Sequence, residues 1–193
     1  MVATFKTIAQ PSEGFYKEKG SKFYAFAIPI QSEAEVKTFI AEKRKAHHQA
    51  VHVCSAFRLG ADLMLYRASD DGEPSNSAGP PILGQIQAFE LTDVLIAVVR
   101  YYGGTNLGVG GLINAYRTAA KEALLNALII EKEEEVELDL TFPYHQMHLV
   151  MDLIKREKVT ILQQDLSEVC KLKLRIPKNK AATINASLDQ LLD

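Results

Sequence analysis

The spacing of apolar residues along the chain predicts a mixture of strands and helices. Residues 22–30 alternate between two faces, which is typical of a half-buried strand, whereas residues 94–99 are apolar throughout, which indicates a central strand. The clearest helix follows them, because the apolar side chains between Leu112 and Leu128 fall on one stripe. The chain is therefore expected to pack a sheet against at least one long amphipathic helix.

Capping and turn residues place further elements in the same part of the chain. Ser32 can accept a hydrogen bond from the backbone N–H three residues on and Glu35 can reach back, so this capping box predicts a helix that ends near Lys45. Residues 60–62, Gly-Ala-Asp, separate two strand-like segments and predict a hairpin. Ser77 is a candidate cap for another helix, and the prolines that follow it are tolerated in a first helical turn.

A mostly charged segment, residues 131–135, marks the boundary between two predicted domains, 1–130 and 131–193. The second domain follows the order strand, helix, strand, strand, helix, in residues 136–142, 144–156, 160–165, 169–176 and 181–192. This order indicates a ferredoxin-like domain, a small two-layer sandwich of sheet and helices. The predicted fold class is α+β with two domains.

Composition limits where a charged ligand could bind. The 193 residues are 47% hydrophobic and 24% charged, which is ordinary for a globular protein, and the formal net charge is −2. Residues 1–130 hold 13 Lys and Arg against 12 Asp and Glu, and residues 131–193 hold 9 against 12. The chain as a whole does not attract nucleic acid or anionic membrane, so any basic site must be local.

The sequence pattern contains no segment that indicates export or membrane insertion. The first residues carry no apolar core of signal-peptide length, and no apolar run reaches the roughly 18 residues of a membrane span. Cys54 and Cys170 are too few and too far apart for a disulfide framework. A cytoplasmic protein without membrane contact is therefore expected.

The glycine-rich segment 103–111 lies between the predicted central strand and the long helix, where phosphate-binding loops are often found. It lacks the lysine of a P-loop, and Ile113 stands where the dinucleotide fingerprint requires a third small residue. Two interpretations remain. The amides of Gly108, Gly110 and Gly111 at the start of the helix could bind an anion, or the glycines could only permit positive φ angles and close packing.

Residues on both sides of the glycine segment favour the anion-binding interpretation. Arg100 precedes Tyr101 and Tyr102, and a cation beside aromatic rings suits stacked bases or a phosphate backbone. Arg117 and Lys121 lie one helical turn apart, on the face away from the apolar stripe. These five residues are candidates for contacts with nucleic acid.

Metal binding and nucleophilic catalysis have weaker support. Asp70, Asp71 and Glu73 could chelate a hard cation, but the spacing of a calcium loop is absent. His52 and Cys54 share one face of a strand, yet no second pair of ligands completes a zinc site. The sequence carries no motif of an activated serine or cysteine. We therefore expect no metal, no cofactor, no catalytic residue and no enzymatic activity.

Two sequence blocks resemble the signature motifs of the YigZ/IMPACT family. The first block runs Val-Arg-Tyr-Tyr-Gly-Gly from residue 99 to 104 and continues with Leu107-Gly108-x-Gly110-Gly111-Leu112 and Ala115-Tyr116. The second runs Asp-Gly-Glu-Pro-Ser from residue 71 to 75 and continues with Ala78-Gly79 and Pro81-Ile82-Leu83. Both blocks stand in the family's order and spacing, and the resemblance covers about residues 1–125.

The resemblance implies a fold and a cellular context. The first domain is expected to share the fold of a small-subunit ribosomal protein's second domain, of domain IV of elongation factor G and of the GHMP kinases. The second domain is expected to resemble domain V of elongation factor G. Eukaryotic IMPACT proteins regulate translation through additional parts, and nucleic-acid binding is the usual inference for bacterial members.

The predicted function is binding to RNA or to the ribosome and translation machinery, linked to the regulation of translation. Two alternatives stay open, namely an enzyme that holds a small phosphorylated molecule in the glycine segment and a protein-interaction module. The oligomeric state is not predicted. The residues expected at the nucleic-acid or anion-binding site are Ser75, Asn76, Ser77, Arg100, Tyr101, Tyr102, Asn106, Gly108, Gly110, Gly111, Arg117 and Lys121.

Overall fold

The computed structural model describes residues 4–192 and contains helices and strands in both parts of the chain. The chain forms two compact units, one from Phe5 to Lys132 and one that begins at Glu133. The division falls inside the charged segment 131–135. Each unit has its own sheet and its own hydrophobic core, so the protein is a mixed α/β protein.

The first unit interleaves strands and helices along the chain. Its elements are β1 (Thr4–Ile8), β2 (Ser12–Glu18), β3 (Ser21–Pro29), α1 (Glu33–Ala46), β4 (His52–Leu59), β5 (Leu65–Ser69), α2 (Gly79–Ala88), β6 (Val94–Tyr101), α3 (Gly108–Leu125) and β7 (Ile129–Glu133). Five strands form an antiparallel sheet in the order β2-β3-β6-β4-β5, and β1 pairs with β7 in a second sheet. The apolar run of β6 is central, as its sequence predicts.

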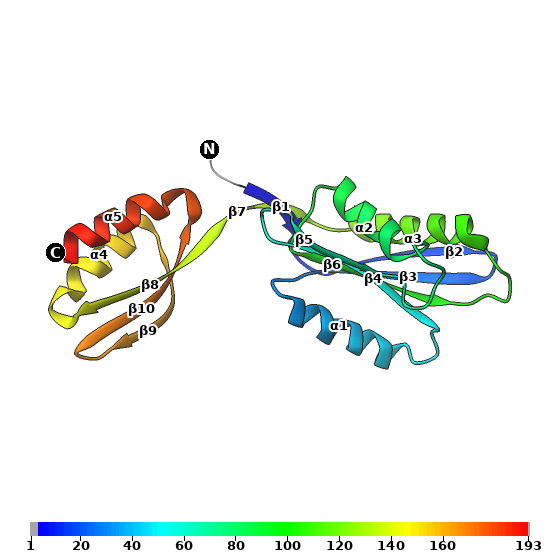
Figure 1. The fold of residues 1–193 in the computed structure, drawn as a ribbon, viewed down its shortest axis with the longest axis horizontal. Coiled ribbons are helices and arrows are strands. Elements are labelled where there is room, and N and C mark those ends of the chain that lie inside the picture. The colour runs from blue at the N-terminus through cyan, green and yellow to red at the C-terminus, as the bar shows by residue number, and fades with distance from the viewer. Residues whose placement is uncertain (1–3, 193) are drawn as a thin grey trace. The chain divides into compact units, whose positions relative to one another are not determined.

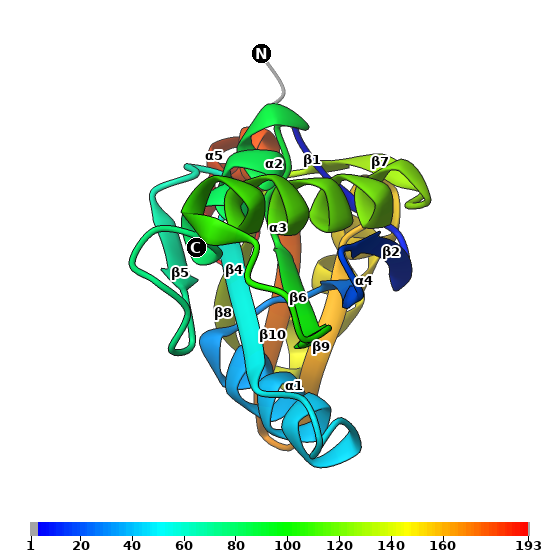
Figure 2. The same ribbon diagram turned by 90° about the vertical axis from the view of Figure 1, so that its right-hand side faces the viewer.

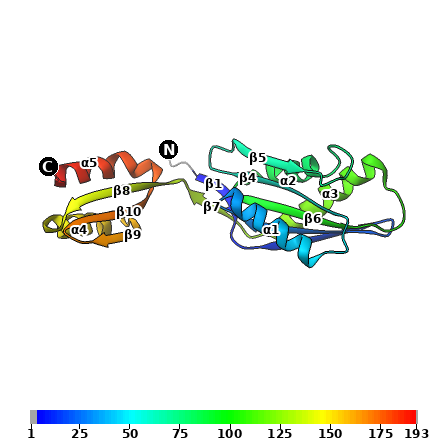
Figure 3. The ribbon, with the colours of Figure 1, turned by 60° about the horizontal axis from the view of Figure 1, so that its bottom comes forward.

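Helices cover the two faces of the five-stranded sheet unequally (Figures 1 and 2). Helices α2 and α3 lie on one face, where Phe23, Ile96 and Tyr116 are fully buried. Helix α1 lies across the other face (Figure 3) and has no buried residue of its own. Its half-buried Phe39 and Ile40 pack against the outer side chains of β4 and β6. The main core of the unit therefore lies under α2 and α3.

The capping box in front of α1 is confirmed. Ser32 Oγ accepts from the N–H of Glu35 at 3.4 Å, and the Glu35 carboxylate accepts from the N–H of Gln31 at 3.2 Å. The hairpin predicted around residues 60–62 is also confirmed, because β4 and β5 pair on either side of it. These elements follow from local sequence signals that the fold does not override.

Helix α2 is capped by a residue other than the one expected. Ser77 does not cap it, because its hydroxyl donates to the carbonyl oxygen of Pro74 at 2.6 Å. The Asp70 carboxylate instead accepts from the backbone N–H groups of Ala78 and Gly79, at 3.0 and 2.8 Å. A more distant carboxylate therefore satisfies the free amides at the start of the helix.

The sequence pattern does not predict β2 or β7. Pro11 and Gly14 are typical of a break, yet β2 begins at Ser12 and pairs with β3 along its whole length. A Cβ atom at position 14 would lie 2.3 Å from the backbone nitrogen of Ala123, so β2 packs directly on the backbone of α3. Strand β7 includes charged residues of the expected boundary, and its pairing with β1 is a contact between distant parts of the chain.

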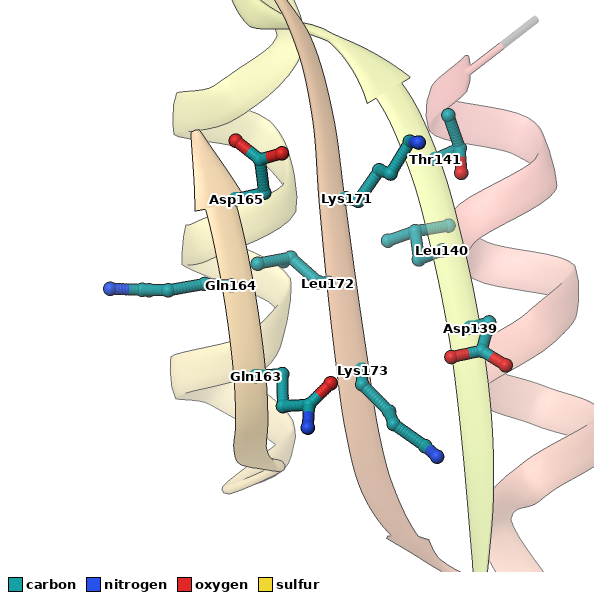
Figure 4. Close-up of a pocket in the computed structure, with 9 residues that line it drawn as sticks. All are labelled: Asp139, Leu140, Thr141, Gln163, Gln164, Asp165, Lys171, Leu172 and Lys173. Atoms are coloured by element: carbon teal, nitrogen blue, oxygen red, sulfur yellow. The ribbon is translucent and has the colours of Figure 1, made fainter. Parts of the chain in front are cut away.

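The second unit packs helices on one face of a three-stranded antiparallel sheet. Its elements are β8 (Glu135–Pro143), the short 3-10 helix η1 (Tyr144–Gln146), α4 (Met147–Glu157), β9 (Thr160–Leu166), β10 (Val169–Pro177), a second 3-10 helix η2 (Lys178–Lys180) and α5 (Ala181–Leu192). The strand order is β8-β10-β9. Figure 4 shows α4 and α5 behind these strands, and on the face of β8 away from the helices Glu137 and Asp139 are exposed. Among the described helices of the chain, none is long and apolar enough to cross a membrane.

Candidate nucleic-acid interface

One end of the five-stranded sheet gathers the segments that the sequence motifs single out (Figure 2). Strand β4 begins there and β6 ends there, so His52 pairs with Arg100 across the two strands. The loop between β5 and α2 reaches the same end through Glu73, which bonds to Arg100. The turn between β2 and β3 meets the glycine segment where Gly20 contacts Gly103. Both motif blocks therefore meet at one site.

A buried hydrogen-bonded network lies at the centre of this end. Arg100 Nη1 and the Tyr116 hydroxyl both donate to Oε1 of Glu73, each at 2.6 Å. Glu73 and Arg100 are 8% and 7% exposed, and Tyr116 is fully buried. His52 Nε2 lies 3.9 Å from Oε2, the other oxygen of the same carboxylate. The two charges depend on each other, because removing either one leaves its partner unpaired in a site that excludes water.

The charge of Arg100 is therefore used inside the protein. Its guanidinium carbon lies 5.7 Å from the ring centre of Phe23 and 5.6 Å from that of Tyr102. Contacts of this kind between a cation and an aromatic face are attractive. The role expected for Arg100 changes accordingly. It is paired with Glu73 and does not offer a free charge to a phosphate, and its guanidinium group lies beside the ring of the exposed Tyr102.

Cys54 extends the network on its buried side. The Cys54 thiol donates to the carbonyl oxygen of Asp70 at 3.0 Å and lies 3.3 Å from the Tyr116 hydroxyl. Burial raises the pKa of the Cys54 thiol, and burial also raises the pKa of the Tyr116 hydroxyl. Both groups are neutral near pH 7, and Cys54 is a packed, hydrogen-bonded residue.

Two aspartates close the loop between β5 and α2. Besides capping α2, Asp70 accepts from the N–H of Asn76 at 2.7 Å, and Asn76 adopts a left-handed φ of 62° that asparagine tolerates better than most residues. Asp71 accepts from the N–H of Val53 at 2.6 Å and pairs with Arg44. These carboxylates are therefore engaged by the protein itself. Within residues 4–192, no group of three His, Cys, Asp or Glu side chains is placed to hold a metal ion.

The glycines of the segment 103–111 have different structural roles. A Cβ atom on Gly103 would lie 2.0 Å from the carbonyl carbon of Gly20, and Gly104 and Gly108 have left-handed φ angles of 84° and 72°. Gly110 has neither constraint, because its φ is not left-handed and, apart from its own helical turn, no atom of the described residues lies within 4 Å of a Cβ built there. The fold therefore requires glycine at Gly103, favours it at Gly104 and Gly108, and does not need it at Gly110.

The first turn of α3 is open to solvent. Among residues 4–192 no side chain caps its start, and its first turn contains no acidic residue. Val109 and Gly110 are exposed there, while Gly111 is partly covered by Leu107. The start of α3 thus differs from the start of α2, where the Asp70 carboxylate occupies the amides. Free N–H groups and the positive end of the helix dipole remain available at α3.

The two neighbouring tyrosines of the motif lie on different faces of the sheet. Tyr102 is 52% exposed, and its hydroxyl lies 3.4 Å from Oδ1 of the exposed Asn106. Tyr101 instead faces α1, where its hydroxyl bonds to Nδ1 of His47 at 2.8 Å. Burial, together with the nearby Lys43 ammonium, lowers the pKa of His47. Only Tyr102 of the pair therefore has a ring that a ligand can reach beside the glycine segment.

The remaining residues of the predicted set are spread around this end. Ser75 and Asn76 are exposed, whereas Ser77 is buried and its hydroxyl is used within the loop. Arg117 and Lys121 are exposed on α3, on the side of the sheet opposite to α1. The predicted set therefore divides into a group at the end of the sheet and a pair along α3.

Six basic residues at this end are absent from the predicted set. They come from the β2–β3 hairpin and from the last turn of α1, and they are Lys17, Lys19, Lys22, Lys43, Arg44 and Lys45. Lys22 pairs with Tyr101 across β3 and β6, and Tyr101 bonds to His47 at the end of α1. The hairpin and the helix end therefore lie on either side of Tyr101. We call these six residues the basic rim.

The sequence does contain a signal for the basic rim, although an ambiguous one. Residues 43–45 read Lys-Arg-Lys, but basic residues are common in the last turn of any helix, where they complement its dipole. The lysines of residues 17–22 are separated by Glu18, Gly20 and Ser21 and form no motif. Only the fold brings the two sets of charges to one place.

Known proteins with similar sequences agree with the motif resemblance. A family model described as "Impact N-terminal domain" matches residues 19–124. A Thermus thermophilus protein named "IMPACT family member in pol 5'region" is 40% identical over 157 residues, which cover 81% of this chain and 84% of that protein. The Escherichia coli protein "IMPACT family member YigZ" is 33% identical over 172 residues, which cover 88% of this chain and 84% of that protein.

The fold also has a counterpart of known structure. A crystal structure described as that of a hypothetical protein matches with a TM-score of 0.80 and 31% sequence identity, over 98% of this chain and 93% of that one. The residues that match the family model include both motif blocks and the buried network that joins them. The chain therefore belongs to the IMPACT family, with an Impact N-terminal domain as its first unit.

Proposed function

We propose that this protein binds RNA at the end of the sheet where the basic rim, Tyr102 and the start of α3 meet, and that it acts on the translation machinery. The basic rim carries the proposal. Within residues 4–192, five of its six side chains form no ion pair with a carboxylate, Arg44 being the exception. Such cations can neutralise a phosphate backbone, and they are concentrated here in a chain whose net charge is −2.

The position of two of these lysines supports an anionic partner. Lys17 and Lys22 are direct neighbours across β2 and β3. Like charges placed directly opposite each other in a sheet are destabilising. A phosphate near both ammonium groups would remove this repulsion, so binding of a polyanion is favoured at this position.

Tyr102 adds a surface on which a base can stack. One side of its ring lies near the guanidinium group of Arg100, and Arg100 is held in place by Glu73. Stacking of a base on an aromatic side chain contributes about 1–3 kcal/mol. The bases of a single strand are free to stack in this way, whereas those of a duplex are already stacked. We therefore expect single-stranded RNA to bind more tightly than duplex RNA.

Changing Tyr102 to alanine is expected to weaken binding to a single-stranded RNA about tenfold, because one stacked base is lost. Fluorescence anisotropy with a labelled RNA measures the change. Tyr66→Ala is the matched control, since Tyr66 is 51% exposed and pairs with Arg58, at the end of β4 that lies away from His52. Equal losses in the two variants would contradict a specific role for Tyr102.

Changing Gly110 to alanine is expected to separate binding from folding. A methyl group has open space there, and alanine favours a helix over glycine by up to about 1 kcal/mol, so the stability of the first unit should be kept or raised. The same methyl group lies beside the amides proposed to meet a phosphate, so RNA affinity is expected to fall about threefold. Thermal unfolding and anisotropy measure both effects, and an unchanged affinity would remove the start of α3 from the interface.

Binding of the full chain to single-stranded RNA at two salt concentrations tests the proposal as a whole. The dissociation constant is expected to rise with salt, because each phosphate neutralised on a single strand contributes about −0.7 to the slope of log K against log salt. A dissociation constant weaker than about 10⁻⁴ M at low salt would overturn the proposal, since that is the weak end of non-specific binding.

The link to translation rests on the resemblance to IMPACT proteins and needs a separate test. We expect the protein to co-sediment with ribosomes and to be released when the RNA is digested with nuclease. Co-sedimentation that survives nuclease treatment would indicate a protein-interaction module instead.

A saturable thermal shift with ATP, abolished by Gly110→Val, would favour a phosphate-binding enzyme.

A further inference from the structure

The two outer strands of the sheet in the second unit differ in regularity. Strand β8 pairs with β10 through nine consecutive residue pairs without a break. Strand β9 pairs with β10 through a register shift at Lys173 and Leu174. Irregularities of this kind protect a sheet edge against further pairing, whereas a long regular edge can accept another strand. Within residues 4–192, no strand pairs with the outer side of β8.

The face of β8 that turns toward the helices is only partly covered. Leu138 and Leu140 pack against the core of the unit but stay half-buried, while their neighbours on β10, Leu174 and Leu172, are buried. A strand added beside β8 would cover these two leucines with side chains from every second of its positions. The edge therefore favours a strand with apolar residues at alternate positions.

The other face of β8 indicates which charge the side chains at the remaining positions of such a strand would carry. Glu135, Glu137 and Asp139 are exposed on the face away from the helices. Glu137 and Glu135 are near basic side chains of β10, at 2.8 Å and 3.8 Å, whereas Asp139 forms no ion pair within the described residues. On a strand added beside β8, the residues opposite these carboxylates are expected to be basic.

We infer that the outer edge of β8, from Glu137 to Thr141, binds an extended segment of a partner protein in which basic and apolar residues alternate. The backbone of the segment extends the sheet, its apolar residues cover Leu138 and Leu140, and its basic residues face the carboxylates. A second copy of this chain fits poorly, because pairing β8 with itself in antiparallel fashion would set carboxylates against carboxylates. This site is separate from the proposed RNA interface, and its carboxylates would repel phosphates.

A synthetic nine-residue peptide of alternating lysine and valine is the probe for this edge. In an NMR titration of the full chain, we expect chemical-shift changes along β8 and slower amide exchange there. The same peptide with a fully N-methylated backbone cannot donate hydrogen bonds to the edge, so it is expected not to bind. Changes on β9 in place of β8, equal binding of both peptides, or no binding at about 1 mM would overturn the inference.

Two aspartates on the open face supply matched variants. Asp139 on β8 and Asp165 on β9 are both exposed, and both line the shallow depression on this face, which Figure 4 shows from the front. Asp139→Lys is expected to weaken binding of the probe about tenfold, and Asp165→Lys is expected to leave it unchanged. Equal weakening by the two variants would show that the probe responds only to net charge, and would overturn the inference.

Discussion

Replacing Glu73 with alanine is expected to lower the free energy of unfolding of the first unit by about 3–5 kcal/mol. The Glu73 carboxylate accepts hydrogen bonds from Arg100 and Tyr116 at 2.6 Å and is almost fully buried. Without it, the guanidinium group of Arg100 stays buried without a counter-charge. Its Nε already lacks a hydrogen-bond partner within the described residues, so no other group there compensates for the loss. The buried Tyr116 hydroxyl also loses its acceptor, which adds to the destabilisation.

Native-state hydrogen exchange of the β6 amides measures this free energy in the intact chain, because β6 is the central strand of the first unit. Ser75→Ala, in the same loop but exposed, is the control and should change stability by no more than about 0.5 kcal/mol. The double change Glu73→Leu with Arg100→Met is expected to cost less than Glu73→Ala, because both charges are removed together. A loss below about 1 kcal/mol for Glu73→Ala would contradict the idea that this pair organises the site.

Reversing the charge at Lys17, Lys22 and Lys45 to glutamate is expected to weaken binding to single-stranded RNA about a hundredfold. The three side chains are exposed and form no ion pair within the described residues, so their loss should scarcely change the fold. Three fewer neutralised phosphates should also reduce the slope of log K against log salt by about 2. Anisotropy titrations at several salt concentrations give both quantities.

A control with the same change of net charge separates the basic rim from overall electrostatics. Lys155, Lys158 and Lys180 of the second unit are also exposed, and none forms an ion pair with a described carboxylate. Changing these three to glutamate is expected to weaken binding by about threefold or less and to leave the salt slope unchanged. If both triple variants lost the same affinity, the basic rim would not be the binding surface.

The sequence predicts most of the fold because most of its elements are defined by local patterns. Helix α1 begins at the Ser32 cap, and the continuous apolar run of β6 becomes the central strand, as expected. Strand β2 could not be predicted in this way. Gly14 is needed for contact with the backbone of α3, and this contact joins positions more than a hundred residues apart, as the Ser12 bond to the carbonyl of Ala123 also does.

The sequence locates the candidate site but does not assign the roles of its residues. From the sequence, Arg100 is expected to be a free cation. The fold pairs it with Glu73, which is 27 residues away in the sequence, so the pairing leaves no local signal. The Ser77 hydroxyl is likewise used by its own loop. In contrast, the sequence around Lys22 and Lys45 predicts only ordinary solvated charges. The topology of the sheet and the position of α1 bring these two residues to the same end of the five-stranded sheet. Pairing across distant segments therefore decides which charges are available to a ligand.

The position of bound RNA is tested most directly by photocrosslinking a single-stranded RNA that carries 4-thiouridine to the full chain. Mass spectrometry of the digested complex identifies the residues that form adducts. We predict adducts at Tyr102, within residues 17–22 and within residues 43–45, and we expect all of them to decrease as salt is raised. Adducts confined to the second unit, or spread evenly over the exposed residues of both units, would contradict binding at the basic rim.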